Sequence, residues 1–355
     1  MDAILPAVYR LAGSLLALMV TASPTVSAHT SSHHTHIRVE PNVNFALPPK
    51  AAGCGGATAL AGGAERIPIT VSTVAGQVEE TVNVCIDGQG PFPFVIDTGA
   101  AGSFIDTRLA AQLDLADEGS SVSFDGVGCT GTGQVVAVAS WSVGGVILAP
   151  QSLVATEQPG VGAARQPVGL LGSDVLSRFG AVRLDFKAQT LTFEGPQGPV
   201  IAAVDGEVHG PTGPLPPAAL THGQSGTTVP LTVVLTPGDI SLNVSVRFGK
   251  GPAQDFVVDT GATASVVADS VVPGAHLAHS DLAQRQDSVC SIITVPLVHS
   301  GHWSIPGLAL HPQLLGAANF GPASAGGIVG AVGSDQLQRF GWVIFDYSGG
   351  RLVLG

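Results

Sequence analysis

Two short segments of the sequence place an acidic residue where carboxyl chemistry is possible. Residues 94–100 read Phe-Val-Ile-Asp-Thr-Gly-Ala, and residues 256–262, which follow 162 positions later, read Phe-Val-Val-Asp-Thr-Gly-Ala. In each copy an apolar run ends at an aspartate, Asp97 or Asp259. A buried carboxyl group is costly unless its charge is used or satisfied. The glycine that follows permits a tight turn with backbone N–H groups facing the carboxylate.

Two such loops brought together would offer two carboxyl groups in contact. Like charges that close cannot both ionise, so the pair shares a proton, and its titration belongs to both groups. The ionised member can take a proton from a water molecule while the protonated member donates to a carbonyl oxygen. Such a pair hydrolyses an amide with no metal, cofactor or covalent intermediate.

The elements that must position these aspartates are repeated as well. Residues 172–180 read Gly-Ser-Asp-Val-Leu-Ser-Arg-Phe-Gly, and residues 333–341, 161 positions later, read Gly-Ser-Asp-Gln-Leu-Gln-Arg-Phe-Gly. Trp141 matches Trp303, and Cys129 falls opposite Cys290. Two copies in the same order predict two similar lobes related by a pseudo-twofold axis, with a cleft between them.

Composition indicates an all-β fold. Of 355 residues, 47 are Gly and 25 are Pro, which favours short strands joined by turns. We expect strands at 78–86, 135–143, 191–193 and 240–248, and short helices at 107–113, 174–179 and 335–340. The net charge of −12 argues against nucleic-acid binding, which needs a basic face.

The order of these features predicts five segments. Residues 1–28 read as a secretory signal peptide, because Arg10 precedes a ten-residue apolar run that is too short to span a bilayer. A His/Ala/Gly-rich extension (29–66), an N-terminal lobe (67–195), a Pro/Gly-rich linker (196–226) and a C-terminal lobe (227–355) follow. We therefore expect a secreted, periplasmic or cell-envelope protein without a stable membrane span.

The sequence resembles aspartic proteases of the pepsin and retropepsin type. The resemblance rests on both aspartate loops and on the apolar-apolar-Gly element downstream of each, Leu170-Leu171-Gly172 and Ala331-Val332-Gly333. The resemblance implies an acid-protease-like fold with Asp97 and Asp259 as the catalytic pair. It further implies supporting roles: a brace between the loops for Thr98 and Thr260, and the turn that seats the water for Gly99 and Gly261.

The sequence departs from the pepsin branch at two points. Ala100 and Ala262 stand where that branch has Ser or Thr, as in retropepsins, so we expect an optimum nearer weak acid. The segment 123–134, in the place of a covering flap, has no Tyr. Its glycines indicate a mobile cover. The equivalent segment of the second repeat, 287–294, has no glycine, so we expect the flap of the first lobe to dominate. The flap candidates are Gly126, Gly128 and Gly131.

The four cysteines, expected to form two structural disulfides in an exported chain, allow three pairings that the sequence leaves open. A bond between Cys129 and Cys290 would join the two covers and count against a protease.

The remaining acids have structural interpretations: Asp174 and Asp335 as helix N-caps, and Asp185 and Asp346 as turn residues. Trp141 and Trp303 are expected in the core.

Two functions follow from the sequence. The first is an exported aspartic endopeptidase, active at acid to weakly acid pH as a monomer on polypeptide substrates. The second is a catalytically silent two-lobed module that binds a peptide or protein. The His-rich tract 29–36 is interpreted as a solvated end rather than a metal site, and no cofactor is expected.

Overall fold

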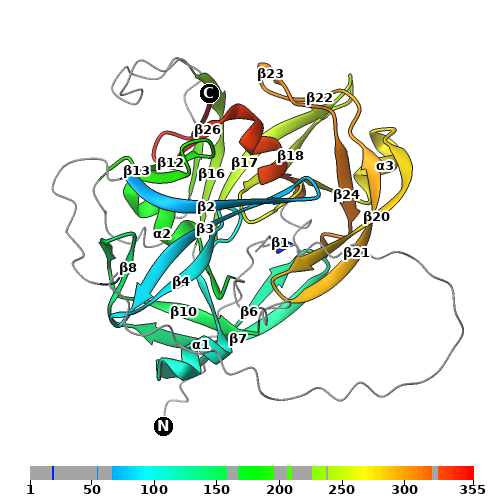
Figure 1. The fold of residues 1–355 in the computed structure, drawn as a ribbon. Coiled ribbons are helices and arrows are strands. Elements are labelled where there is room, and N and C mark those ends of the chain that lie inside the picture. The colour runs from blue at the N-terminus through cyan, green and yellow to red at the C-terminus, as the bar shows by residue number, and fades with distance from the viewer. Residues whose placement is uncertain are drawn as a thin grey trace, which may run out of the picture.

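The computed structural model describes residues 18–19, 54, 66–157, 167–195, 206–209, 226–236, 239–321 and 327–355. Most of the predicted signal peptide, of the N-terminal extension with its His-rich tract, and of the linker lies outside the described residues. The fold is all-β, with two similar halves (Figure 1).

Strands β1 to β13 belong to the first half of the sequence and strands β14 to β27 to the second. The bounds in the first half are β1 (Leu18–Met19), β2 (Arg66–Val74), β3 (Gln77–Ile86), β4 (Gln89–Ile96), β5 (Phe104–Asp106), β6 (Ala116–Gly126), β7 (Cys129–Val138), β8 (Trp141–Val143), β9 (Val146–Leu148), β10 (Gln151–Thr156), β11 (Gly169–Leu171), β12 (Ala181–Asp185) and β13 (Thr190–Phe193). The bounds in the second half are β14 (Gly206–His209), β15 (Thr227–Pro230), β16 (Thr232–Thr236), β17 (Asp239–Phe248), β18 (Ala253–Asp259), β19 (Val266–Ala268), β20 (Ala278–Ser288), β21 (Ser291–His299), β22 (Trp303–Ile305), β23 (Leu308–Ala309), β24 (Leu314–Ala318), β25 (Ile328–Gly333), β26 (Trp342–Asp346) and β27 (Arg351–Leu354).

The helices are short. They are α1 (Thr107–Gln112), α2 (Ser173–Leu176), α3 (Val271–Gly274) and α4 (Ser334–Leu337), with 3-10 turns at η1 (Ser177–Phe179) and η4 (Gln338–Phe340). Three of the predicted helices are therefore present, two of them as one α turn followed by a 3-10 turn. Among the described residues, no helix has the length and apolar character that crossing a bilayer requires.

Each aspartate lies at the end of a strand held between two neighbours. Strand β4 pairs antiparallel with β3 and parallel with β11, with Ile96 opposite Leu171. Strand β18 pairs in the same way with β17 and β25, with Val258 opposite Val332. The downstream Gly-containing element of each repeat is thus the strand beside its own aspartate, which explains why the two motifs recur together.

The two halves are joined by strands β12 and β26, which pair antiparallel. Arg183 lies opposite Ile344, and these residues occupy equivalent positions 161 apart in the two repeats. A strand pair centred on equivalent residues is what a twofold operation produces. The pair is part of one path, β15-β27-β26-β12-β13-β2, to which both halves contribute.

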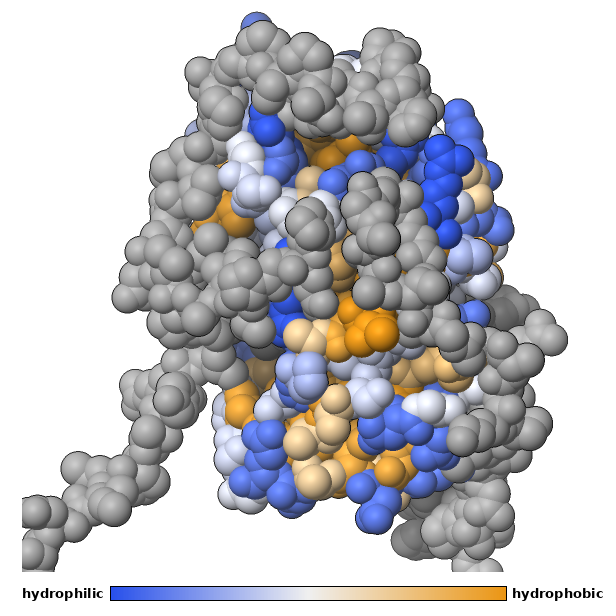
Figure 2. Space-filling view, turned by 90° about the vertical axis from the view of Figure 1, so that its left-hand side faces the viewer, coloured by the Kyte–Doolittle hydropathy of each residue, from blue (hydrophilic) through white to orange (hydrophobic). Residues whose placement is uncertain are grey.

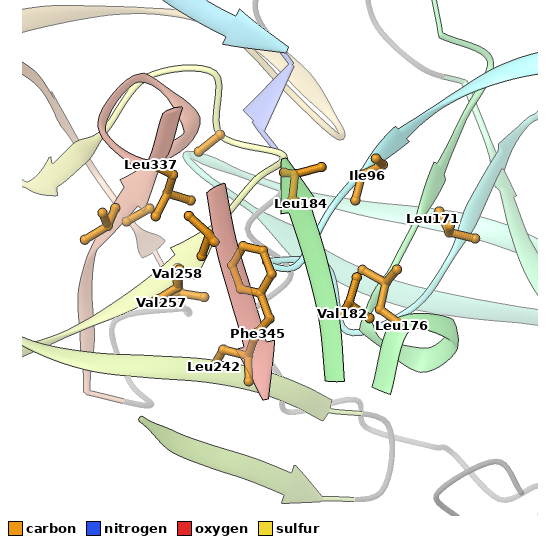
Figure 3. Close-up of a cluster of buried hydrophobic side chains, with 14 of the residues drawn as sticks. Ile96, Leu171, Leu176, Val182, Leu184, Leu242, Val257, Val258, Leu337 and Phe345 are labelled. Carbon is orange, nitrogen blue, oxygen red and sulfur yellow. The ribbon is translucent and has the colours of Figure 1, made fainter. Parts of the chain in front are cut away.

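Apolar residues from both halves meet next to this junction (Figure 3). Ile96 and Leu171 come from the first aspartate-bearing unit, and Val258 and Leu337 come from the second. All four are at most 3% exposed, so the packing fixes the two units relative to each other. On the face drawn in Figure 2, hydrophobic and hydrophilic residues of the described chain are interspersed.

Three expectations about structural residues have clear outcomes. Trp141 and Trp303 are each 2% exposed, as a core role predicts. Asp185 and Asp346 accept bonds from the N–H groups of Ala188 (2.8 Å) and Gly349 (2.7 Å), which confirms their turn role. The predicted strand over 135–143 is instead two strands, because β7 ends at Val138 and β8 begins at Trp141.

Candidate active site

The two aspartates are fully buried and held by the turns that follow them. Asp97 and Asp259 are both 0% exposed. One oxygen of Asp97, Oδ1, accepts the N–H groups of Gly99 (3.0 Å) and Ala100 (2.8 Å). Oδ1 of Asp259 accepts the N–H of Ala262 (3.0 Å) in the same way. The Oδ1 atom of each aspartate is therefore fixed by backbone N–H groups of its own loop.

The two carboxyl groups lie close enough to influence each other's titration. The glycine of each loop is pressed against the carboxyl group of the other loop. A Cβ on Gly99 would lie 2.3 Å from Cγ of Asp259, and a Cβ on Gly261 would lie 2.3 Å from Cγ of Asp97. Only glycine fits at these two positions, and the approach is reciprocal.

Burial raises the pKa of both carboxyl groups, and the negative charge of Asp97 raises the pKa of Asp259 further. Within the described chain, Oδ2 of Asp97 and Oδ2 of Asp259 have no hydrogen-bond partner while both groups are ionised. One proton between the carboxyl groups would relieve the repulsion and supply the missing donor. The geometry therefore favours a singly protonated pair.

The threonine after each aspartate connects the loops. Thr98 N–H donates to Oγ1 of Thr260 (3.0 Å), and Thr260 N–H donates to Oγ1 of Thr98 (3.1 Å). Each hydroxyl in turn donates to a carbonyl of the opposite strand, at Val258 (2.8 Å) and Ile96 (2.6 Å). The four hydrogen bonds hold the carboxyl groups at a fixed separation.

A serine at the start of each downstream helix supports the loop from behind. Ser173 N–H donates to the carbonyl of Ala100 and Ser334 N–H to that of Ala262, both at 2.8 Å. Their hydroxyls reach the carbonyls of Thr98 (3.0 Å) and Thr260 (3.1 Å).

Each serine also meets a residue from the other half, and here the symmetry is broken. Ser173 Oγ is hydrogen-bonded to the hydroxyl of Tyr347 (2.9 Å), whereas Ser334 Oγ lies 2.7 Å from Oε2 of Glu80. Burial is the largest influence on Glu80 and raises its pKa to about 8. A protonated Glu80 donates to Ser334, which leaves the serine proton for the carbonyl of Thr260.

A second polar network, which the sequence analysis did not identify, surrounds Asp174 and Asp335. These residues do not cap their helices, because Gly172 and Gly333 occupy the N-cap positions; that prediction is wrong. Their carboxylates accept bonds from elsewhere in the same half. The donors are Ser103 Oγ (2.6 Å) and Gln151 Nε2 (2.8 Å) for Asp174, and Ser265 Oγ (2.7 Å) and Gln313 Nε2 (2.7 Å) for Asp335.

The same serines receive the N–H groups of the two N-cap glycines, at 2.9 Å in the first half and 3.0 Å in the second. The 162-residue offset of the aspartates also relates Ser103 to Ser265 and Gln151 to Gln313. Aligning the two repeats residue by residue beyond the continuous motifs would have identified these serines and glutamines.

The flap candidates lie on the hairpin formed by β6 and β7: Gly126 ends β6, Gly128 lies in the turn with φ +73°, and Gly131 lies in β7. The hairpin of β20 and β21 is its counterpart, with 11 and 9 residues in its strands against 11 and 10. The two hairpins are thus of similar length, and the expectation that one flap dominates stays a prediction.

The cysteines pair as Cys54–Cys85 and Cys129–Cys290. The second bond joins the two hairpins at their tips, where they approach each other in Figure 1. Among the described residues, no three His, Cys, Asp or Glu side chains are grouped as a metal site would need.

Comparison with known proteins supports the resemblance for part of the chain. Residues 82–175, which include the Asp97 loop, match a family model described as aspartyl protease. A structural match is the crystal structure of an aspartic proteinase from Irpex lacteus, with 14% identity, a TM-score of 0.46, and coverage of 82% of this chain and 97% of that chain. The sequence matches no curated protein.

Proposed function

We propose that this chain is an exported aspartic endopeptidase that hydrolyses peptide bonds of polypeptides, with Asp97 and Asp259 as the acid–base pair. The observation that carries the proposal is the contact between two buried carboxyl groups with raised pKa values. Both come from one chain, so a monomer suffices. We further propose the lobe boundaries 67–195 and 227–355, with the linker 196–226 between them.

In the proposed reaction one proton is shared by the pair at the start. The ionised carboxyl takes a proton from the attacking water, and the protonated carboxyl donates to the carbonyl oxygen of the peptide bond. The oxygen of the water then bonds to the carbonyl carbon to give a neutral gem-diol. The protonated carboxyl then donates to the amide nitrogen while the ionised carboxyl takes a proton from one gem-diol hydroxyl. Cleavage of the C–N bond releases a carboxylic acid and an amine, and the pair again holds one proton.

The supporting residues have distinct proposed tasks. Thr98 and Thr260 keep the carboxyl groups in contact through their mutual hydrogen bonds. Gly99 and Gly261 leave room for that contact and for the water. The hairpin with Gly126, Gly128 and Gly131 would cover bound substrate and offer strand edges to an extended polypeptide.

A weakly acid optimum follows from the same site. At positions 100 and 262 only a methyl group is present, so no side-chain hydroxyl there can stabilise the ionised pair. Burial raises both pKa values further. Export is supported by the leader-like residues 1–28 and by two disulfides, which persist in oxidising compartments.

Casein hydrolysis between pH 3 and 7, with and without a dithiol reductant and a statine-type inhibitor, tests the proposal. Asp97→Asn and Asp259→Asn should each lose at least about 100-fold in activity and keep their folding transition. Asp114→Asn is the matched control, because Asp114 is exposed with φ +52°, a conformation that asparagine tolerates. Wild-type activity in either dyad variant would remove that aspartate from the mechanism.

The second candidate is a catalytically silent module that binds a peptide or protein. The Cys129–Cys290 bond favours it, because joined hairpins restrict entry to the aspartates. Correctly processed protein that cleaves nothing at any pH, in oxidised or reduced form, would support this alternative.

A further inference from the structure

The two hairpins that face each other above the aspartates are covalently joined. One consists of β6 and β7, and the other of β20 and β21. Cys129 follows the turn of the first, and Cys290 lies in the turn of the second, with 6.0 Å between their Cα atoms. The cysteines are related by the same 161-residue offset as the repeats, so the bond links equivalent tips.

Side-chain packing holds the tips together as well. Val289, from the second hairpin, is 1% exposed and belongs to an apolar cluster otherwise formed by the first half. Gly126 approaches the second hairpin so closely that a Cβ there would lie 2.5 Å from Oγ of Ser288. The other members of the cluster are Val95, Ala100, Phe104, Phe124 and Leu170.

This cluster connects the cover to the aspartate loop. Ala100, whose N–H binds the Asp97 carboxylate, and Val289 belong to the same apolar cluster, so the tip of the second hairpin and the first loop share one packed core. Both aspartates are 0% exposed with the disulfide formed. The joined hairpin tips and the first aspartate loop thus belong to one packed unit, and separating the tips would loosen the cover over Asp97.

We propose that Cys129–Cys290 is a reducible site that keeps the hairpins closed over the aspartates, and that a dithiol reductant opens them. This regulation rests on the proposed protease function. A thiolate of the reductant attacks one sulfur, the S–S bond breaks and a mixed disulfide forms. The second thiol of the reductant then displaces the cysteine. The products are two cysteine thiols and an oxidised dithiol, and the two electrons come from the reductant.

The position of the bond suits attack from solvent. Cys129 and Cys290 are both half-buried at the hairpin tips; in the other disulfide Cys54 is half-buried as well and Cys85 is 8% exposed. The Cys54–Cys85 bond ties position 54 to β3 and joins no part of the second half, which makes it the matched control.

Casein hydrolysis by four preparations tests the proposal: oxidised wild type, dithiothreitol-treated wild type, Cys129→Ser/Cys290→Ser, and Cys54→Ser/Cys85→Ser. We expect the oxidised wild type to be at least about tenfold less active than the reduced protein, because the cover must open before substrate binds. Cys129→Ser/Cys290→Ser should be active without reductant. Cys54→Ser/Cys85→Ser should still require reductant. If Cys129→Ser/Cys290→Ser does not fold, the comparison of Cys54→Ser/Cys85→Ser with and without reductant still tests the proposal.

Two results separate the failure of this proposal from the failure of the proposed function. Equal activity of oxidised wild type and Cys129→Ser/Cys290→Ser would overturn the regulation and leave the protease intact. If no preparation cleaves casein, the protease proposal fails, and amide hydrogen exchange of residues 116–138 and 278–299 still tests the closure. Reduction of Cys54→Ser/Cys85→Ser should speed exchange at both tips, and unchanged protection would overturn the proposal.

Discussion

Thr98 and Thr260 are hydrogen-bonded to each other in both directions: the N–H of each donates to the hydroxyl of the other, at 3.0 and 3.1 Å. These hydrogen bonds tie the two aspartate loops together directly. Because both residues are fully buried, a lost hydroxyl leaves the partner N–H and a strand carbonyl without water to replace it.

Thr98→Val should therefore lower the free energy of unfolding by about 3 kcal/mol, since two buried hydrogen bonds disappear while the side-chain volume is kept. Urea unfolding measures the loss. Thr98→Ser keeps the hydroxyl and should lose less than half as much. Equal losses in the two variants would assign the effect to the methyl group rather than to the brace.

Gly99→Ala should reduce the activity by at least about 100-fold, because the added Cβ would lie 2.3 Å from the Asp259 carboxyl carbon and must displace it. Gly102→Ala, three positions along the same loop, is a control with no atom within 4 Å of the added Cβ. Its activity should stay near wild type. A Gly99→Ala variant as active as Gly102→Ala would show that the close contact of the carboxyl group is dispensable.

Stability should fall as the pH rises from about 5 to 8. The folded-state pKa of Glu80 is raised to about 8, that of Glu79 to about 7 and that of Asp335 to about 6, in each case mainly by burial. The folded protein therefore binds more protons than the unfolded chain across this range. The stabilisation is fully present below the unfolded-state pKa values and is lost as the pH passes the folded-state values.

The melting temperature between pH 4.5 and 8.5 measures this dependence. A loss of about 2 kcal/mol corresponds to about 5 °C for domains of this size. Glu80→Gln, which remains a hydrogen-bond donor to Ser334 but does not titrate, should flatten the profile. A wild-type melting temperature that increases toward pH 8 would contradict the assignment of protonated buried acids.

Ser103→Ala and Ser265→Ala should destabilise the chain by similar amounts, about 1–3 kcal/mol each, since each serine connects an aspartate carboxylate to a glycine N–H at equivalent positions. Thermal unfolding of the two variants checks this. Ser152→Ala is a control in the same network region, where the hydroxyl binds an exposed carboxylate. A loss confined to one of the two variants would show that the halves do not use this contact equally.

Some of this structure could be read directly from the sequence. The aspartate loops and their downstream elements are continuous motifs repeated at a fixed offset, so two matching units and their contact were predictable. The strands at 78–86 and 240–248 alternate regularly and lie within β3 and β17. Local pattern suffices where the information is within one segment.

Other features depend on contacts between distant segments. Glu80 lies in a strand rich in polar residues, and its burial results from helix α4 of the other half packing on β3. The sequence predicts Asp174 as a helix cap, yet Gly172 occupies the cap position and the Asp174 carboxylate binds Ser103 and Gln151. The pairing of four cysteines is likewise decided only by which segments meet in space.

The pH dependence of kcat/KM for casein, measured on Cys129→Ser/Cys290→Ser so that the cover is open, tests most directly whether Asp97 and Asp259 work as a pair with one proton. Only the singly protonated pair can both accept and donate, so kcat/KM should pass through a maximum at weakly acid pH and fall on both sides. An activity that continues to rise from weak acid through pH 9, as for a single general base, would contradict the shared proton.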